Sequence, residues 1–277
     1  MMITVIEILC VGNELLSGIT MNTNAHWIAG RVAAAGGTVS RITVVRDELA
    51  AISSAVKESL ARKPGILVIT GGLGATYDDM TLEGVAAALG RPLVLDKKAA
   101  GMLKNSYKRR GLKYRINRVR LKMATIPQGA TPIENMVGSA PSVAIDSGKG
   151  TKIFCTPGVP SEMKDVFKKH VLPLVRRQVG RFSAEEANYM VAGVSEAMIA
   201  PALAKIVGSN PPHSLYLKTH PRGYLKKPVM TPRIRVQLIC KGDDREEVKE
   251  RHRRVSALLL KEIRRLGGRL EERRRRR

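Results

Sequence analysis

The residues whose types and spacing could best support ligand binding or catalysis are ten in a row, from Thr70 to Asp79, which read TGGLGATYDD. Three glycines in this run allow sharp turns and leave backbone N–H groups bare, so that they can bind an anion. Thr76 adds a hydroxyl donor, and a helix expected to begin at about Met80 adds its positive end. We therefore predict that this loop binds a phosphate group.

Asp78 and Asp79 conflict with a phosphate at the same loop, because like charges repel. A divalent cation between the carboxylates and the phosphate would remove the conflict. A second interpretation is that the aspartates only cap the helix that follows. Capping explains one aspartate, but it does not explain three glycines and a threonine beside it. We therefore favour a ligand site between a strand and a helix.

Three other loops follow predicted strands and carry polar or turn-forming residues. Residues 12–14 (Gly-Asn-Glu) follow the first strand, with Asn24 soon after, and Asp47 follows the second strand. Residues 157–160 (Pro-Gly-Val-Pro) follow the last strand of the same region. Each motif alone is weak evidence for a site, because Gly, Asn and Pro are common in turns. Because the carboxyl ends of parallel strands meet at one edge of a sheet, we expect these loops to lie near the glycine loop.

Alternating strand-like and helix-like segments position these loops. Gly65–Thr70 is short and wholly apolar, as in strands buried on both faces of a parallel sheet. Further strands are predicted at Thr4–Val11, Thr38–Val45, Lys122–Ile126, Val143–Asp146 and Thr151–Cys155, and helices at Asn22–Ala35, Glu48–Arg62, Met80–Leu89, Lys97–Arg110 and Ser161–Gln178. The repeated β-α-β order predicts an α/β fold, a mostly parallel sheet sandwiched by helices.

The pattern changes after Gly180 to that of a small α+β unit. Strands are predicted at Tyr189–Val194, Ser214–Thr219 and Ile234–Cys240, and helices at Glu196–Ile206 and Asp244–Leu266. Residues 271–277 are a polar run with no means of burying itself. We therefore predict a ligand-binding domain over 1–180, a small α+β domain over 181–268 and a basic, disordered tail over 269–277.

The net charge of +24 is distributed unevenly. Residues 1–100 hold 9 Lys and Arg against 9 Asp and Glu, residues 101–180 hold 16 against 4, and residues 181–277 hold 23 against 11. Such an excess attracts polyanions, which keeps a nucleic-acid-binding function open for the basic C-terminal half. No Gly-basic-basic-Gly loop of the kind that clamps a nucleic-acid backbone is present, so this function is not favoured. A solvated basic surface explains the charge equally well.

The remaining composition indicates a cytoplasmic protein that is not inserted in a membrane. Cys10, Cys155 and Cys240 lie far apart in apolar runs, which argues against a disulfide framework and for a reducing compartment. No apolar run is long enough for a membrane-spanning helix. The first eleven residues carry no positively charged leader or cleavage site, and they include Glu7, so they are interpreted as a buried strand.

Six motifs occur in an order that resembles one known family. They are GNELLSG…N at 12–24, VRD at 45–47, TGGLGATYDDMT at 70–81, PQGATPIEN at 127–135, VGSAP at 137–141 and PGVPSEM at 157–163. The chain thus resembles the competence/damage-inducible protein A (CinA) family, whose first domain has the MoaB/Mog molybdopterin-binding-type fold. The resemblance covers about residues 4–180 and continues more faintly into a small KH-like domain. The family's C-terminal amidase domain has no counterpart in these 277 residues, so amidase activity is not expected.

The resemblance implies a metal-dependent ADP-ribose pyrophosphatase, with Mg²⁺ or Co²⁺ as the divalent ion and potassium as a further cation. It also implies a homodimer. Two positions depart from the family's pattern: Ala75 replaces a proline and Ser142 replaces a glycine. Together the motifs and the resemblance give catalytic residues Asp47, Asp78 and Asp79, metal ligands Glu14, Asp78 and Asp79, and substrate-binding residues Gly12, Asn13, Asn24, Thr70, Gly71, Gly72, Gly74, Thr76, Asn135, Gly138, Pro157, Gly158 and Pro160.

Our preferred interpretation of the sequence is therefore a hydrolase that cleaves the pyrophosphate of a nucleoside-diphosphate sugar. The glycine loop would bind the phosphates, and the carboxylates would hold the metal ion. The alternative is a protein of molybdenum cofactor biosynthesis that binds or adenylates a pterin. Both use the same loop, so the sequence separates them poorly.

Overall fold

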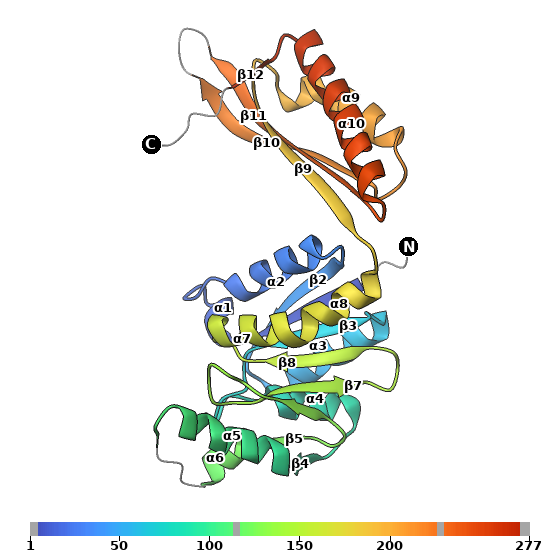
Figure 1. The fold of residues 1–277 in the computed structure, drawn as a ribbon. Coiled ribbons are helices and arrows are strands. Elements are labelled where there is room, and N and C mark those ends of the chain that lie inside the picture. Colours follow the sequence, from blue (N-terminus) through green and yellow to red (C-terminus); the bar gives the residue numbers. More distant parts are fainter. Residues whose placement is uncertain (1–4, 113–116, 226–229, 272–277) are drawn as a thin grey trace. The chain divides into compact units, whose positions relative to one another are not determined.

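The computed structural model describes residues 5–112, 117–225 and 230–271. The chain divides into two compact units, Met1–Val179 and Gly180–Arg277 (Figure 1). Each unit is described by itself below. None of the helices in the described part of the chain combines the length and hydropathy that crossing a membrane requires.

The first unit is built on a six-stranded sheet in the order β2-β1-β3-β8-β7-β6. Four neighbouring strands are parallel, and the last two are antiparallel to their neighbours. Their bounds are β1 (Val5–Val11), β2 (Thr38–Val45), β3 (Ile66–Thr70), β6 (Thr131–Ile133), β7 (Ser142–Asp146) and β8 (Lys152–Thr156). All five residues of β3 are buried, as predicted for a central strand. The mostly parallel α/β sheet is therefore confirmed.

Helices cover both faces of this sheet (Figure 1). On one face, α2 (Thr23–Ala34) packs against α7 (Pro160–Val166) and α8 (Leu172–Val179). On the other, α3 (Leu49–Arg62) packs against α4 (Thr81–Leu89) over a core of Ile, Leu and Val side chains from the sheet and from both helices. A one-turn helix, α1 (Asn13–Leu16), follows β1 directly. The loops after β1, β2, β3 and β8 therefore share one edge of the sheet.

An excursion between α4 and β6 differs from the prediction. The predicted strand Lys122–Ile126 is confirmed only in part: strand β5 covers Thr125–Pro127, beginning three residues later than predicted, and residues Arg118–Lys122 form helix α6. Asn117 caps α6 by accepting a hydrogen bond from the Arg120 N–H, a local contact that favours the helix. Strand β5 pairs with β4 (Leu93–Leu95) in a separate two-stranded sheet. The predicted helix at Lys97–Arg110 is confirmed as α5 (Lys97–Arg109).

The predicted helix Ser161–Gln178 contains a wide turn. Residues Phe167–Val171 form a π-helical segment, η1, between α7 and α8. Pro173 follows it, and proline has no N–H to donate and crowds the preceding turn. A π turn of this kind re-aims the side chains on the helix around it.

The second unit is a four-stranded antiparallel sheet in the order β10-β11-β9-β12. Its bounds are β9 (Ser183–Ala192), β10 (Leu215–Leu225), β11 (Thr231–Gly242) and β12 (Arg269–Leu270), and its helices are α9 (Glu196–Gly208) and α10 (Arg245–Arg265). Both helices pack on the sheet and against each other. Strand β9 begins six residues before its predicted start at Tyr189, because Ser183–Asn188 pair with β11.

The beginning of the predicted disordered tail is ordered. Arg269 and Leu270 pair with β9, and the Glu271 carboxylate accepts hydrogen bonds from the Arg233 guanidinium, one of them at 2.7 Å from Nε. The charge of the Glu271 side chain is thus neutralised by Arg233, which is 38 positions away in the sequence. The residues next to Glu271 in the sequence give no sign of this contact. The rest of the predicted tail, residues 272–277, lies outside the described residues.

The most buried ion pair in the first unit holds helix α3 to strand β1. Glu7 is 4% exposed, and its two carboxylate oxygens accept hydrogen bonds from Nε and Nη2 of Arg62 at 2.7 and 2.8 Å. Burial raises the pKa of Glu7, but the hydrogen bonds and charge of Arg62, together with smaller contributions from Ser59 and Arg41, outweigh it, so that the pKa lies below its usual value. The pair therefore stabilises the fold when Glu7 is ionised.

We predict that Arg62→Gln lowers the free energy of unfolding by about 2–4 kcal/mol at pH 7, because a buried carboxylate loses its partner. The matched control is Arg46→Gln, whose exposed pair with Glu48 spans 3.8 Å and should contribute less than about 0.5 kcal/mol. Urea unfolding measures both. Because the folded-state pKa is lowered, the difference between wild type and Arg62→Gln should shrink as the pH falls through it. Equal losses for the two variants would contradict this assignment.

Candidate functional site

A cavity of about 490 Å³ lies at the sheet edge where β1, β2, β3 and β8 end. Of the residues predicted from the sequence, the structure brings eleven together in its lining: Gly12, Glu14, Asp47, Gly71, Gly72, Gly74, Thr76, Asp78, Asp79, Pro157 and Gly158. They come from four loops that are far apart in the chain. The parallel sheet brings them together because each loop follows the carboxyl end of a strand.

The glycine loop passes so close to its neighbours that side chains are excluded. A Cβ at Gly71 would lie 2.1 Å from the carbonyl oxygen of Val11, and Gly71 has φ of +105°. A Cβ at Gly72 would lie 2.4 Å from Oγ1 of Thr81, whose hydroxyl donates to the Gly71 carbonyl at 2.8 Å. These positions require glycine because any larger residue would push β1 and the start of α4 away from the loop.

The same loop offers free backbone donors. In the described part of the chain, the N–H groups of residues 72–75 donate to no other protein group. Gly72, Leu73 and Gly74 line the cavity. Unpartnered amides at the mouth of a cavity can bind the oxygens of an anion without displacing an internal hydrogen bond.

Thr76 organises the two aspartates. Its backbone N–H donates to Oδ2 of Asp79 at 2.8 Å, and its hydroxyl oxygen lies 2.5 Å from Oδ1 of Asp78 and also contacts Asp79. A hydroxyl has one hydrogen, so it can donate to only one of the two carboxylates at a time. The hydrogen bond from Thr76 lowers the pKa of Asp78, which keeps that carboxylate ionised. The site thus retains negative charge that internal donors do not neutralise.

The pKa of Asp47 is shifted in the opposite direction from that of Asp78. Burial raises the pKa of Asp47, and the negative charges of Glu14, Asp78 and Asp79 raise it further. Its Oδ2 accepts a hydrogen bond from the backbone N–H of Asn13 at 2.7 Å, which fixes the orientation of the carboxylate. Asn13 therefore acts on the site through its backbone. A carboxylate with a raised pKa and a fixed orientation is a stronger proton acceptor than an exposed one.

Asn24, Thr70 and Pro160 line a smaller hollow of about 90 Å³ beside the main cavity. The Asn24 amide donates to Oγ1 of Thr70 at 3.1 Å and to the carbonyl of Gly158 at 2.7 Å. The Thr70 hydroxyl in turn donates to the carbonyl of Pro157 at 3.0 Å. These predicted ligand-binding residues therefore fasten the loop after β8 to strand β3 and to helix α2.

Asn135 and Gly138 lie behind the cavity wall. Asn135 is 2% exposed; its Oδ1 accepts from the N–H groups of Val137 and Gly138, at 3.1 and 2.8 Å. Its Nδ2 donates to the carbonyl of Ala140 and, at 2.6 Å, to Oε2 of Glu162. A Cβ at Gly138 would overlap the Glu162 carboxylate. The two residues predicted to bind substrate thus shape the 135–140 loop and position a carboxylate that lines the cavity.

Arg110, Ser139 and Glu162 also line the cavity and were not predicted. Arg110 follows helix α5; its Nη2 donates to Oγ of Ser139, its Nε donates to the carbonyl of Ser106 at 3.1 Å, and its guanidinium lies 5.2 Å from the ring centre of Tyr107. Among the described residues that line this cavity, it is the sole Lys or Arg. The sequence showed a densely basic run here, but not that one of its arginines turns toward the glycine loop.

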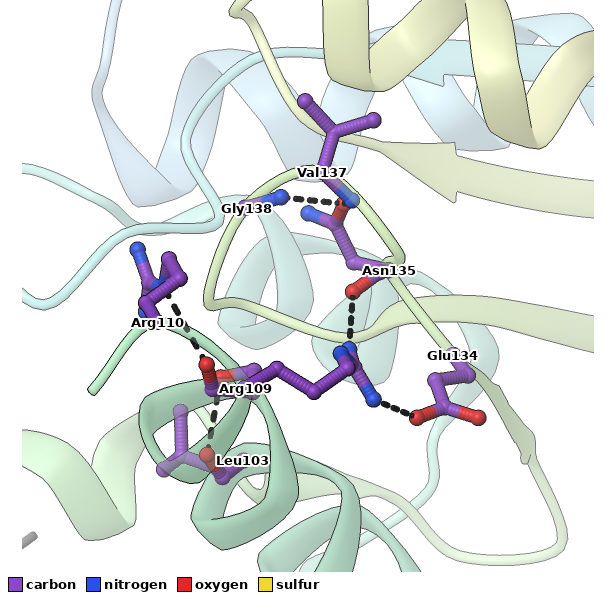
Figure 2. A network of polar contacts seen from close by, with 8 residues as sticks. Leu103, Arg109, Arg110, Glu134, Asn135, Val137 and Gly138 are labelled. Atoms are coloured by element: carbon purple, nitrogen blue, oxygen red, sulfur yellow. Dashed lines mark hydrogen bonds and ion pairs between the residues drawn. The ribbon is translucent and has the colours of Figure 1, made fainter. Parts of the chain in front are cut away.

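The neighbouring Arg109 anchors the end of α5 to the 135–140 loop. Figure 2 shows its guanidinium between Glu134, with which it forms an ion pair, and the carbonyl of Asn135, to which it donates at 2.9 Å. Helix α5 is thereby fixed beside the loop that carries Ser139. Arg109 therefore positions Arg110 without entering the cavity.

The carboxylates suit a divalent cation that also binds the ligand. Across the described residues, no three His, Cys, Asp or Glu side chains converge as a metal cluster. Mg²⁺ is commonly held by one or two carboxylates together with water and substrate phosphates, so Asp78 and Asp79 are a sufficient protein contribution. The single Thr76 hydrogen shared between these carboxylates leaves oxygen lone pairs available for such an ion.

Comparison with known proteins identifies the family. Residues 7–177 match the model of MoCF_biosynth, described as a probable molybdopterin binding domain. A protein from Metallosphaera sedula is 43% identical over 265 residues, which are 96% of each chain. A protein from Sulfolobus acidocaldarius is 41% identical over 270 residues, 96% of this chain and 97% of the relative.

A solved structure extends the likeness to three dimensions. The crystal structure of the protein CinA from Thermoplasma acidophilum, described as of unknown function, is 37% identical with a TM-score of 0.55, covering 63% of this chain and 98% of that one. The resemblance inferred from the motifs is thus supported by sequence and by fold. The chain belongs to the family of probable molybdopterin binding domains, as a CinA-like member.

Proposed function

We propose that this chain hydrolyses the pyrophosphate bond of a nucleoside-diphosphate sugar such as ADP-ribose, with a divalent metal ion. One observation carries the proposal: free amide donors, an arginine and ionised carboxylates line the same cavity. Amides and arginine bind phosphate oxygens, whereas carboxylates repel them unless a cation lies between. A phosphorylated substrate that arrives with a metal ion uses both sets of groups.

The substrate phosphates would be bound by the N–H groups of residues 72–74 and by the Arg110 guanidinium. Arg110 is held from three sides, by Ser139, the Ser106 carbonyl and the Tyr107 ring, so little side-chain entropy remains to be lost on binding. A planar guanidinium can donate two parallel hydrogen bonds to one phosphate. The substrate's pyrophosphate would thus be oriented between the glycine loop and helix α5.

Asp78 and Asp79 would hold the metal ion, Mg²⁺ or Co²⁺; Glu14, the third ligand expected from the sequence, lines the same cavity but does not form a three-carboxylate cluster with them among the described residues. When bound, such an ion neutralises charge on the phosphates and lowers the pKa of a bound water. Asp47 would accept the proton of the attacking water, for which its raised pKa is suited. The water oxygen would then form a bond to one phosphorus while the bond between that phosphorus and the bridging oxygen of the pyrophosphate breaks. ADP-ribose would thus give AMP and ribose 5-phosphate.

A second candidate is binding or adenylation of a pterin in the same cavity. The observation that favours it is the family itself, whose description is of probable molybdopterin binding. The glycine loop and Arg110 would then bind the pterin's phosphate, and no water would need activation. A fluorescent pterin that co-purifies with the protein, together with no turnover of ADP-ribose under any metal, would favour this candidate over hydrolysis.

We predict that Asp47→Asn and Asp78→Asn each lower kcat for ADP-ribose by about 10²-fold or more, because each removes a charge that the reaction requires. AMP release with Mg²⁺ or Co²⁺ measures this. Asp165→Asn, which changes a surface aspartate paired with Lys169, should leave kcat unchanged. If Asp47→Asn and Asp78→Asn turn over like Asp165→Asn while remaining folded, the mechanism is wrong.

The pH dependence of kcat/KM should reflect the protonation of Asp47. Because its pKa is raised, Asp47 becomes protonated at a higher pH than an ordinary aspartate, whose pKa is about 3.9. The acid limb of kcat/KM should therefore fall at a pH clearly above that value. Burial of the ionised carboxylate costs stability, so Asp47→Asn should also unfold at a higher temperature than wild type near neutral pH. An acid limb at the pH of an ordinary aspartate would exclude Asp47 as the base.

We predict that Arg110→Gln raises KM for ADP-ribose about tenfold or more while changing kcat little, because it removes a phosphate contact present in ground and transition states alike. Lys108→Gln removes a positive charge two residues away on α5, and it should leave KM unchanged. Steady-state kinetics distinguishes the two variants. Equal KM values for them would show that Arg110 does not contact the substrate.

A further inference from the structure

A second cavity, of about 330 Å³, lies elsewhere in the first unit. It is lined by residues of β6, β7 and β8 and by His170, Leu174 and Arg177 of the η1–α8 helix. It shares no lining residue with the cavity at the glycine loop. Along β8, the second cavity reaches Lys152, where the strand begins, whereas the first reaches Pro157, after the strand has ended. The two are therefore separate sites.

The floor of this cavity is set by the register of three strands. Thr131 lies opposite Ala144, and Ala144 lies opposite Phe154, so these three residues form one row across the sheet. In the next row on the same face, Asp146 lies opposite Lys152. The floor thus combines an apolar surface at Phe154 and Ala144 with the Thr131 hydroxyl, a positive charge at Lys152 and a negative charge at Asp146.

One face of a helix forms the wall. His170, Leu174 and Arg177 follow the spacing i, i+4, i+7, which places them on the same side of the η1–α8 helix. His170 belongs to the π-helical segment, and π turns occur frequently at functional sites because they re-aim side chains. The wide turn thus adds an imidazole to a wall that already carries a guanidinium.

Two side chains around the cavity, those of Lys152 and Arg177, are positively charged, whereas burial and the charge of Lys169 lower the pKa of His170, so its imidazole is a neutral donor at pH 7. In the part of the chain that the structure describes, the side chains of Lys152, His170 and Arg177 make no hydrogen bond or ion pair. Arg91 brings a further guanidinium to the rim, where its Nη2 donates to the carbonyl of Asp146 at 2.7 Å. The one carboxylate of the lining, that of Asp146, accepts a hydrogen bond from the Gly148 N–H at 2.9 Å and so faces its own turn.

We propose that this cavity is a second ligand site, which binds a small organic phosphate, a phosphate monoester with a sugar or nucleoside body. Lys152 and Arg177 bind the phosphate dianion, with His170 and Thr131 as further donors. The carbon body packs on Phe154, Ala144 and Leu174. A volume of about 330 Å³ lies at the small end of the range for ligand pockets, which fits a sugar phosphate or a mononucleotide. This proposal does not depend on the hydrolytic function proposed for the first cavity.

The test is calorimetric titration of the full chain with AMP, ribose 5-phosphate, inorganic phosphate and adenosine. Wild type should bind AMP or ribose 5-phosphate, and it should bind adenosine and inorganic phosphate at least tenfold more weakly. The double variant Lys152→Gln/Arg177→Gln should lose about tenfold or more of the affinity for the phosphate monoester. The matched control, Lys149→Gln/Arg176→Gln, removes the same charge from exposed positions outside the lining and should bind like wild type.

Arg110→Gln separates the two cavities, because Arg110 lines only the first. Binding that persists in Arg110→Gln and is lost in Lys152→Gln/Arg177→Gln supports the second site. Binding that follows Arg110 instead places the ligand at the glycine loop and overturns the proposal. Equal losses in the double variant and its control, or no binding of either phosphate monoester to wild type, would also overturn it.

Discussion

The close passage of the Gly71 backbone beside the end of β1 is the constraint on which the site depends. A side chain at Gly71 would meet the carbonyl of Val11 at 2.1 Å, so the loop after β3 can lie against β1 only if this residue has none. With the loop in that place, Thr81 can donate to the Gly71 carbonyl and begin helix α4. The amides of residues 72–74 are then exposed at the cavity that Asp47 and Asp78 also line.

This arrangement brings hydrogen-bond donors for an anion and carboxylates to the lining of one cavity. An anion at the amide donors would be repelled by the carboxylates unless a cation lies between them. The pKa values of two of these carboxylates are shifted in opposite directions. A hydrogen bond from Thr76 lowers the pKa of Asp78, whereas burial and its neighbours' charges raise that of Asp47. Two carboxylates with oppositely shifted pKa values are suited to different tasks, one to hold a cation and one to accept a proton.

Features that depend only on residues close together in the chain could be predicted from the sequence. The apolar run of β3 predicted a buried central strand, and the Thr70–Asp79 loop was recognised from its glycines and its place between a strand and a helix. The Asn117 cap of α6 is equally local, but the sequence prediction placed a strand at Lys122–Ile126 and no helix before it. The family also followed from motifs that the structural comparison supports.

Features that depend on distant contacts could not be predicted. Glu271 pairs with Arg233, 38 residues away, and Arg110 lines the cavity beside the 135–140 loop, to which Arg109 fastens α5. Asn135 and Gly138 were expected at the substrate, but the space beside them is filled by the Glu162 carboxylate. Such outcomes are set by packing between segments, which the pattern of a single segment does not record.

The most direct test of this account is to titrate ADP-ribose by calorimetry into the Asp47→Asn variant, in which turnover is slow, once with Mg²⁺ and once with EDTA. If carboxylates and amide donors share one ligand through a cation, binding should be strong with Mg²⁺ and at least about tenfold weaker in EDTA. Equal affinity in both conditions would contradict the account, because the carboxylates would then contribute nothing to the way the cavity binds a phosphate.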